Sequence, residues 1–306
     1  MPAVPTYVVI TPARNEAEFI ELTIQSMVAQ SVLPIRWIIV SNGSTDGTDD
    51  IVRKYAAQHA WIELLRTPER KERHFAGKVN AFNAGYARVK DLEHDAIASM
   101  DGDISMDPDY FPFLLRKLAE DSSLGLVGTP FEEGANQVYD YRFVNIEHVS
   151  GACQLFRRTC FEEIGGYVPV RGGGIDYIAV IAARMQGWKT RTFPEKVCQH
   201  HRRMGTAEQG AFQAKMKLGA KDHALGNHPL WELFRAAYQM TKQPVVVGGV
   251  AILAGYVGAW LRRAEKSVSA DMQAFVRHEQ MDRLKRFITG GRSTANHALH
   301  RPENRA

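Results

Sequence analysis

Near its N-terminus the chain reads YVVITPARNE (residues 7–16), a β-branched run that passes directly into a polar turn. A run of this kind is typical of a buried strand. The segment from Glu16 to Gln30 then places apolar residues at helical spacing, which predicts a helix. The chain therefore begins with a predicted strand, turn and helix.

The same unit recurs through the first hundred residues. The strand-like runs WIIV (37–40), WIELL (61–65) and AIASM (96–100) alternate with helical patterns at residues 51–56 and about 78–90. Strands that alternate with helices of this length indicate parallel βαβ units. In such sheets ligands bind beyond the carboxyl ends of the strands. We therefore expect an α/β fold, with a mostly parallel sheet flanked by helices and a ligand site at one sheet edge.

The composition is that of a folded protein without a basic main domain. Of 306 residues, 45% are hydrophobic and 24% are charged, and the net charge is +4. Residues 262–306 hold ten Lys/Arg against five Asp/Glu, so this tail carries +5 and residues 1–261 carry −1. No nucleic-acid partner is therefore expected. The three cysteines lack metal-type spacing, which favours a reducing compartment.

A domain boundary is expected near residue 230, with a C-terminal helical region over residues 231–306. Within that region, residues 244–261 contain no charge, and their eighteen residues are near the lower limit for a membrane-spanning helix. A single crossing, a re-entrant or interfacial course and a buried soluble helix are the alternatives. The basic tail favours the re-entrant or interfacial course, because positive residues tend to remain on the cytoplasmic side. We expect association with a membrane surface.

Polar residues follow three of the predicted strands. Asp101-Gly102-Asp103 comes directly after one of them, and two carboxylates one residue apart suit a hard divalent cation, Mg²⁺ or Mn²⁺. The turns PARNE (12–16) and SNGSTDGT (41–48) follow two others, where a helix N-terminus offers free N–H groups to an anion. Each motif by itself is also compatible with a simple turn or helix cap.

Taken together and in this order, the motifs resemble family 2 glycosyltransferases with the GT-A fold. The resemblance covers roughly residues 5–205. Its further matches, in the family's order, are GKVNAFNAG (77–85), Ser150-Gly151-Ala152, Arg157-Arg158 and Gly165-Gly166-Tyr167. It implies a metal-dependent enzyme that transfers a sugar from a nucleotide-sugar donor, a UDP-sugar first of all, to an acceptor hydroxyl. It also implies a Rossmann-like nucleotide-sugar-binding half over residues 1–105 and an acceptor half over residues 106–230.

The resemblance assigns roles on the donor side. The implied donor-binding residues are Thr11, Pro12, Ala13, Glu16, Asn42, Lys78 and Asp101. Asn42 stands where the family commonly has an aspartate that hydrogen-bonds the base, and an amide donates as well as accepts, so the base is open. Lys78 would approach the diphosphate. Asp101 would contact ribose or metal, and Asp103 would bind the metal directly.

Roles on the acceptor side follow from the same resemblance. Asp176 falls where the family carries its general base, and Ile175 replaces the first acid of the usual pair. A single base implies one in-line displacement and therefore inversion at the anomeric carbon. The alternative for Asp176 is a helix N-cap.

The segment HHRR (residues 200–203) resembles the family's stretch beyond the base. There His200, in preference to His201, would complete the metal sphere. Arg202 and Arg203 would close over the donor phosphates, because a guanidinium pairs well with phosphate oxygens.

Three other functions are weighed against this one. Transfer to a polyprenyl phosphate remains open. A nucleotidyltransferase would need a Gly-x-Gly-Thr-Arg loop where residues 11–14 read TPAR. A non-catalytic membrane-binding scaffold is disfavoured by the three intact aspartates. The expected setting is cell-envelope or exopolysaccharide synthesis at the cytoplasmic face of the inner or plasma membrane, with a lipid-linked or saccharide acceptor.

Overall fold

The computed structural model describes residues 4–68, 75–133, 146–170, 173–202, 211–242 and 245–289. The chain divides into two compact units, Met1–Ala207 and Glu208–Ala306. This division comes earlier than the boundary expected near residue 230, which lies inside α8 (Pro229–Met240). The reason is that α7 (Ala211–Ala224) packs on α9 (Val247–Leu261), so it belongs with the C-terminal helices.

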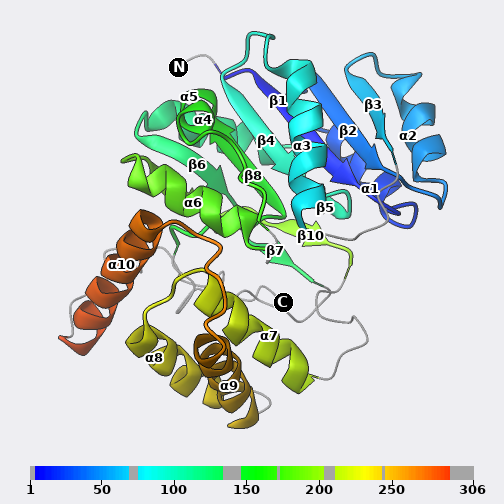
Figure 1. Ribbon diagram of the computed structural model, residues 1–306. Coiled ribbons are helices and arrows are strands. Elements are labelled where there is room, and N and C mark those ends of the chain that lie inside the picture. The colour runs from blue at the N-terminus through cyan, green and yellow to red at the C-terminus, as the bar shows by residue number, and fades with distance from the viewer. Residues whose placement is uncertain are drawn as a thin grey trace, which may run out of the picture. The chain divides into compact units, whose positions relative to one another are not determined.

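Strands and helices alternate through the first unit (Figure 1). Its strands are β1 (Tyr7–Ala13), β2 (Arg36–Asn42), β3 (Ile62–Thr67), β4 (Ala96–Met100), β5 (Ile104–Met106), β6 (Leu124–Gly128), β7 (Phe131–Glu132), β8 (Cys153–Arg157), β9 (Lys189–Thr192) and β10 (Cys198–His200). Its helices are α1 (Ile20–Val28), α2 (Thr48–Ala56), α3 (Phe75–Val89), α4 (Tyr110–Glu120), α5 (Arg158–Glu163) and α6 (Ile175–Met185).

A mixed sheet in the order β3-β2-β1-β4-β8-β6-β9 forms the centre of this unit. β1 pairs in parallel with β2 and β4, and β3 pairs in parallel with β2. β8 runs antiparallel between β4 and β6. The buried side chains of Tyr7, Trp37 and Phe111 belong to the core packed against the sheet. The predicted α/β fold is confirmed, and the carboxyl ends of β1 to β4 share one edge.

Helix α3 lies across β1 and β2 in Figure 1, and Gly85 allows this close approach. A Cβ atom at residue 85 would come 2.7 Å from Ile10 Cγ2 and 2.9 Å from Val40 Cγ2. Both side chains are fully buried in a close-packed interior, so neither has room to retreat. Lys78 lies about two turns earlier on the same helix, so this packing fixes its place at the sheet edge.

The first helix begins later than the sequence predicted. α1 starts at Ile20 and not at Glu16, and its N-cap is Phe19. Asn15 has a φ of 55°, which turns the chain before the helix can start. Its Oδ1 accepts a hydrogen bond from the Thr45 N–H at 2.9 Å, which ties the loop after β1 to the loop after β2. The role of Asn15 is therefore to join two loops and not to cap α1.

A second, smaller sheet has the order β5-β10-β7. β10 runs antiparallel to β5, with His200 paired to Ile104 in the register. β5 begins at Ile104, directly after the Asp-Gly-Asp turn. The pairing with β5 therefore brings residues 198–200 beside that turn.

The described residues of the second unit form α7, α8, α9 and α10 (Ala270–Ile288). Glycines let α7 and α9 pack backbone to backbone. A Cβ at Gly219 would lie 1.8 Å from the Ile252 carbonyl oxygen, and one at Gly255 would lie 1.9 Å from that of Met216. Among the described helices, none combines the length and the apolar character needed to cross a membrane. Pro244, the first residue of the predicted membrane segment, lies outside the described residues.

Candidate active site

Asp101, Asp103 and His200 form a group at the carboxyl edge of the large sheet. The two aspartates follow β4 directly, and the pairing of β10 with β5 brings the histidine to them. One ligand atom from each residue lies within 4.8 Å of those of the other two. Two carboxylates and one imidazole are a ligand set that suits a divalent cation.

His200 is the histidine that reaches the carboxylates. Its Nε2 lies 3.7 Å from Asp103 Oδ1, and its Nδ1 lies 3.4 Å from Glu133 Oε1. A carboxylate on the far side of a metal-facing imidazole helps to orient the ring. His201 instead places its Nε2 at 2.9 Å from Ser105 Oγ. Glu133 was absent from the predicted set, because its position is set only by the second sheet.

Two cations neutralise the carboxylates of this edge. The Lys78 ammonium forms an ion pair with Asp101. The Arg202 guanidinium forms an ion pair with Glu16, and its Nε donates to Asp103 Oδ2 at 3.2 Å. The edge therefore holds three acidic and two basic side chains joined in ion pairs. When a charged ligand binds, these side chains can exchange their present partners for the ligand.

The environment of these groups shifts their protonation. Burial raises the pKa of Glu16 to about 7, and the Asp103 carboxylate adds to the rise, although Arg202 opposes it. Burial also raises the pKa of Asp101, although the Lys78 ammonium opposes that rise. Burial alone would lower the pKa of Lys78, but the Asp101 carboxylate beside it raises that pKa overall. Lys78 therefore stays a cation, and a further positive charge at this edge would favour ionised carboxylates.

Asp176 lies in the first turn of α6. The N-cap of this helix is Gly174, which has a φ of 88° and makes no side-chain capping hydrogen bond. Asp176 therefore does not cap α6, which was the alternative that the sequence left open. A glycine suits this cap because a left-handed conformation costs little without a Cβ.

Gly151 brings Asp176 next to the aspartates of the metal group. A Cβ at residue 151 would lie 3.0 Å from the Asp176 Cβ and 3.1 Å from its Oδ2. The neighbouring Ala152 carbonyl accepts a hydrogen bond from the Asp101 N–H at 2.9 Å. The charges of Asp101, Asp103 and Asp176 also all raise the pKa of Lys78. The three aspartates therefore meet at one edge of the sheet.

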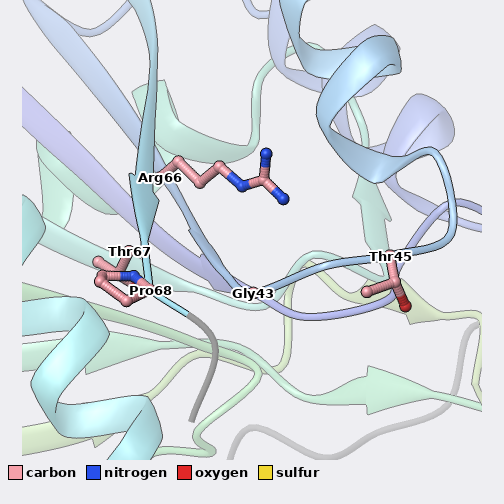
Figure 2. Close-up of a pocket in the computed structure, with 5 residues that line it drawn as sticks. All are labelled: Gly43, Thr45, Arg66, Thr67 and Pro68. Carbon is pink, nitrogen blue, oxygen red and sulfur yellow. The ribbon is translucent and has the colours of Figure 1, made fainter.

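A pocket of about 360 Å³ opens at the ends of β2 and β3, on the same edge of the sheet. Figure 2 shows Arg66, Thr67 and Pro68 on one side and Thr45 on the other, with Gly43 between them. The Thr67 hydroxyl also lies 3.2 Å from Asn42 Oδ1 and donates to it. Asn42, where the resemblance placed recognition of the base, is therefore hydrogen-bonded to a residue that lines the pocket.

The comparison with protein families identifies the family to which the chain belongs. The profile of "Glycosyl transferase family 2" matches residues 8–165, which is more than half of the chain and includes the carboxyl ends of β1 to β4. The chain belongs to glycosyl transferase family 2.

One curated relative of this family 2 chain is the poly-beta-1,6-N-acetyl-D-glucosamine synthase of Staphylococcus aureus. The two are 29% identical over 170 residues, which cover 49% of this chain. The match spans only 39% of that synthase, so the chain corresponds to well under half of its relative's length.

Two solved structures share the fold. The mannosyltransferase PcManGT from Pyrobaculum calidifontis, in complex with GDP-Man and Mn²⁺, superposes with a TM-score of 0.57 at 20% identity, over 95% of this chain and 84% of that one. Residues 1–349 of S. aureus TarS, in complex with UDP-GlcNAc, give a TM-score of 0.51 at 13% identity, over 89% and 78% of the two chains. Both confirm the GT-A architecture of this family 2 chain.

Not every implied donor-binding residue presents its side chain to the pocket. The Thr11 hydroxyl is fully buried and accepts a hydrogen bond from Trp37 Nε1 at 2.9 Å. The Ala13 side chain is also buried, and Pro12 is half-buried. Arg203 lies outside the described residues.

Arg66 and Thr67 were missed by the sequence reasoning. They follow the predicted strand 61–65 directly, so the rule applied to the other strand ends pointed to them as well. The remaining predicted polar groups, namely Glu16, Asn42, Lys78, Asp101, Asp103 and His200, lie along this edge of the family 2 domain.

The Gly151→Ala variant tests whether the place of Asp176 matters. The added Cβ would crowd Asp176, which the resemblance makes the general base. Because small displacements of a reacting group are costly, we expect turnover at least about tenfold lower. Steady-state kinetics would measure this, with thermal melting to verify the fold. Gly258→Ala on α9 is the matched control, since its nearest neighbour is the flexible Arg262 side chain at 3.4 Å. Equal turnover in both variants would show that Asp176 tolerates the displacement.

Proposed function

We propose that this chain transfers a sugar from a nucleoside diphosphate sugar to an acceptor hydroxyl, with a divalent cation and with inversion at the anomeric carbon. The observation that carries the proposal is the meeting of a metal-type group, Asp101, Asp103 and His200, with Asp176 across the Gly151–Ala152 segment. A metal-type group and a separate carboxylate at one edge of the sheet are the groups that such a transfer requires.

The ligand set fits a divalent cation. Asp103 and His200 are buried with their side chains 9% and 8% exposed, and Glu133 stands behind the imidazole. Mn²⁺ and Mg²⁺ both accept carboxylate oxygens, and the imidazole makes Mn²⁺ the more suitable of the two. When bound, such a cation neutralises the charge that develops on the departing diphosphate. The PcManGT structure that shares this fold holds Mn²⁺, which supports the proposal.

The basic residues then have a defined task. Lys78 and Arg202 now pair with Asp101, Glu16 and Asp103. In the donor complex we expect both to turn toward the diphosphate, where a guanidinium offers paired N–H donors. Lys78 and Arg202 are paired with carboxylates before the donor binds and would be paired with phosphate oxygens afterwards. Neither cation is therefore buried without an anionic partner.

Asp176 is the proposed general base. An ionised carboxylate there would accept the proton of the acceptor hydroxyl as its oxygen attacks the anomeric carbon. The sugar–phosphate bond breaks as the new sugar–oxygen bond forms, and the nucleoside diphosphate leaves with the electron pair. Ile175 occupies the adjacent position, so no second carboxylate precedes Asp176 to act as a nucleophile. One displacement gives inversion.

The donor and acceptor classes are also proposals. The pocket beside Asn42 has the place of a base site, and uridine is the first candidate, supported by the UDP-GlcNAc complex of TarS. A saccharide or lipid-linked acceptor in cell-envelope polysaccharide synthesis is supported by the synthase relative. Membership in a glycosyl transferase family favours sugar transfer over nucleotidyl transfer.

A thermal-shift screen tests the donor class. UDP-, GDP- and CDP-sugars are compared, and one that binds should stabilise the protein by about 2.7 kcal/mol when its concentration is about 100 times its dissociation constant, a shift of several degrees. We expect the nucleotide sugars of one base to give this thermal shift in the presence of Mn²⁺ or Mg²⁺. The shift should be smaller when a chelator removes the metal. The free sugars are the control. No shift with any nucleotide sugar would contradict the proposal.

A further inference from the structure

Helix α9 carries an apolar face that no described residue of its own unit covers. Val247, Val250, Ala254, Val257 and Leu261 recur at alternating intervals of three and four residues, so they form one stripe along the helix. All five side chains are exposed, Val257 by 39% and Leu261 by 69%. We call this stripe the outer face of α9.

The opposite face of α9 is already occupied. Its buried residues include Gly249, Ile252, Gly255 and Tyr256. A Cβ at Gly249 would lie 2.3 Å from the Ala236 carbonyl oxygen of α8, and Gly255 packs as closely on α7. This backbone-to-backbone packing fixes the rotation of α9 about its axis. The outer face is therefore held outward by the packing of its own unit.

The charges next to this stripe select the kind of partner. Arg262 and Arg263 follow its last residue, both are exposed, and neither forms an ion pair with a described residue. The sequence from Arg262 onward has a net charge of +5. Trp260, beside them, is 63% exposed and has the apolar ring and polar N–H that suit a membrane–water interface. An aliphatic stripe that ends beside a tryptophan and two arginines without a described acidic partner matches acyl chains below a layer of anionic headgroups.

The length of the helix sets its orientation. Fifteen residues span about 22 Å at 1.5 Å per residue, which is less than the roughly 30 Å hydrocarbon thickness of a bilayer. A helix lying in the interface plane needs only one apolar face, and α9 has one. We propose that the outer face of α9 docks on a bilayer surface that contains anionic lipids, with α9 parallel to that surface. This docking is separate from the proposed sugar transfer and does not require it.

Flotation of the full chain with lipid vesicles tests the docking. We expect the protein to float with phosphatidylglycerol–phosphatidylcholine vesicles and less with phosphatidylcholine alone. A double variant, Val250→Asp with Val257→Asp, should lower the partition coefficient at least about tenfold, since two valines would lose their apolar burial. Arg262→Gln with Arg263→Gln should remove most of the preference for the anionic vesicles, at about fivefold per arginine.

The matched control is Leu22→Asp with Leu33→Asp in the first unit. These leucines are 44% and 45% exposed, as Val250 is at 45%, so the substitutions have the same chemical character on another surface. Circular dichroism and thermal melting would verify the fold of each variant. Unchanged flotation of the α9 variant, or equal loss in the control, would overturn the docking. The docking would also be overturned if the wild-type chain does not float with vesicles but forms a dimer, and the α9 variant does not. The outer face would then bind a second copy of the chain.

Discussion

The Asp103→Ala variant is expected to lose the part of donor binding that depends on a divalent cation. Asp103 is the most buried carboxylate of the metal-type group, and His200 Nε2 lies 3.7 Å from it. Without it the diphosphate would enter an edge that lacks one of the two proposed anionic metal ligands. We expect the affinity measured by calorimetry in Mn²⁺ to fall by at least about tenfold, the usual scale for weakened metal sites.

Asp107→Ala is the matched control for this change. Asp107 is four residues further along the chain, its side chain is 72% exposed, and its partner is Lys196. We expect this variant to bind donor as the wild type does. A donor affinity that responds equally to Mn²⁺ in wild type and Asp103→Ala would remove the metal role of this group.

The Asp176→Asn variant is expected to bind donor normally and to turn over at least about 10²-fold more slowly. An amide has nearly the shape of the carboxylate but cannot take the proton of the acceptor, and general-base removal has this cost. The loss should appear in kcat, with the calorimetric affinity for the donor unchanged. A loss in donor affinity alone would place Asp176 on the donor side.

Asp271→Asn provides a close structural control. Asp271 is the second residue of α10, as Asp176 is the second residue of α6, so each is an acid in a first helical turn. Both variants lose the same favourable contact with the helix dipole, about 0.3–1 kcal/mol of stability. Equal effects on melting with unequal effects on kcat would separate catalysis from helix stabilisation. If Asp176→Asn turned over normally, the carboxylate would have only the structural role.

The sequence was sufficient to predict that the carboxyl ends of β1, β2 and β4 lie at one edge of the sheet. Their apolar runs are long enough to identify buried strands, and the parallel βαβ rule places their carboxyl ends together without knowledge of the packing. The same rule applied to β3 would have identified Arg66 and Thr67. The signal for Arg66 and Thr67 was therefore present in the sequence.

Other features had no local signal. The start of α1 depends on Asn15, whose left-handed turn is stabilised by Thr45 in another loop. The inward direction of the Thr11 hydroxyl depends on the Trp37 indole across the strand pair. Propensity and spacing describe only near neighbours in the chain, so contacts of this kind between loops and strands remained invisible.

The sequence by itself determined the strand–helix alternation, the acidic turn after β4 and the family resemblance, because each depends on residues a few positions apart. Only the tertiary structure decided which histidine joins Asp101 and Asp103, because that choice depends on the pairing of β10 with β5 about a hundred residues away. It also decided that Asp176 lies beside Gly151 and that α9 turns an apolar face outward. Sheet register and helix rotation are set by packing over the whole fold, and no local pattern contains them.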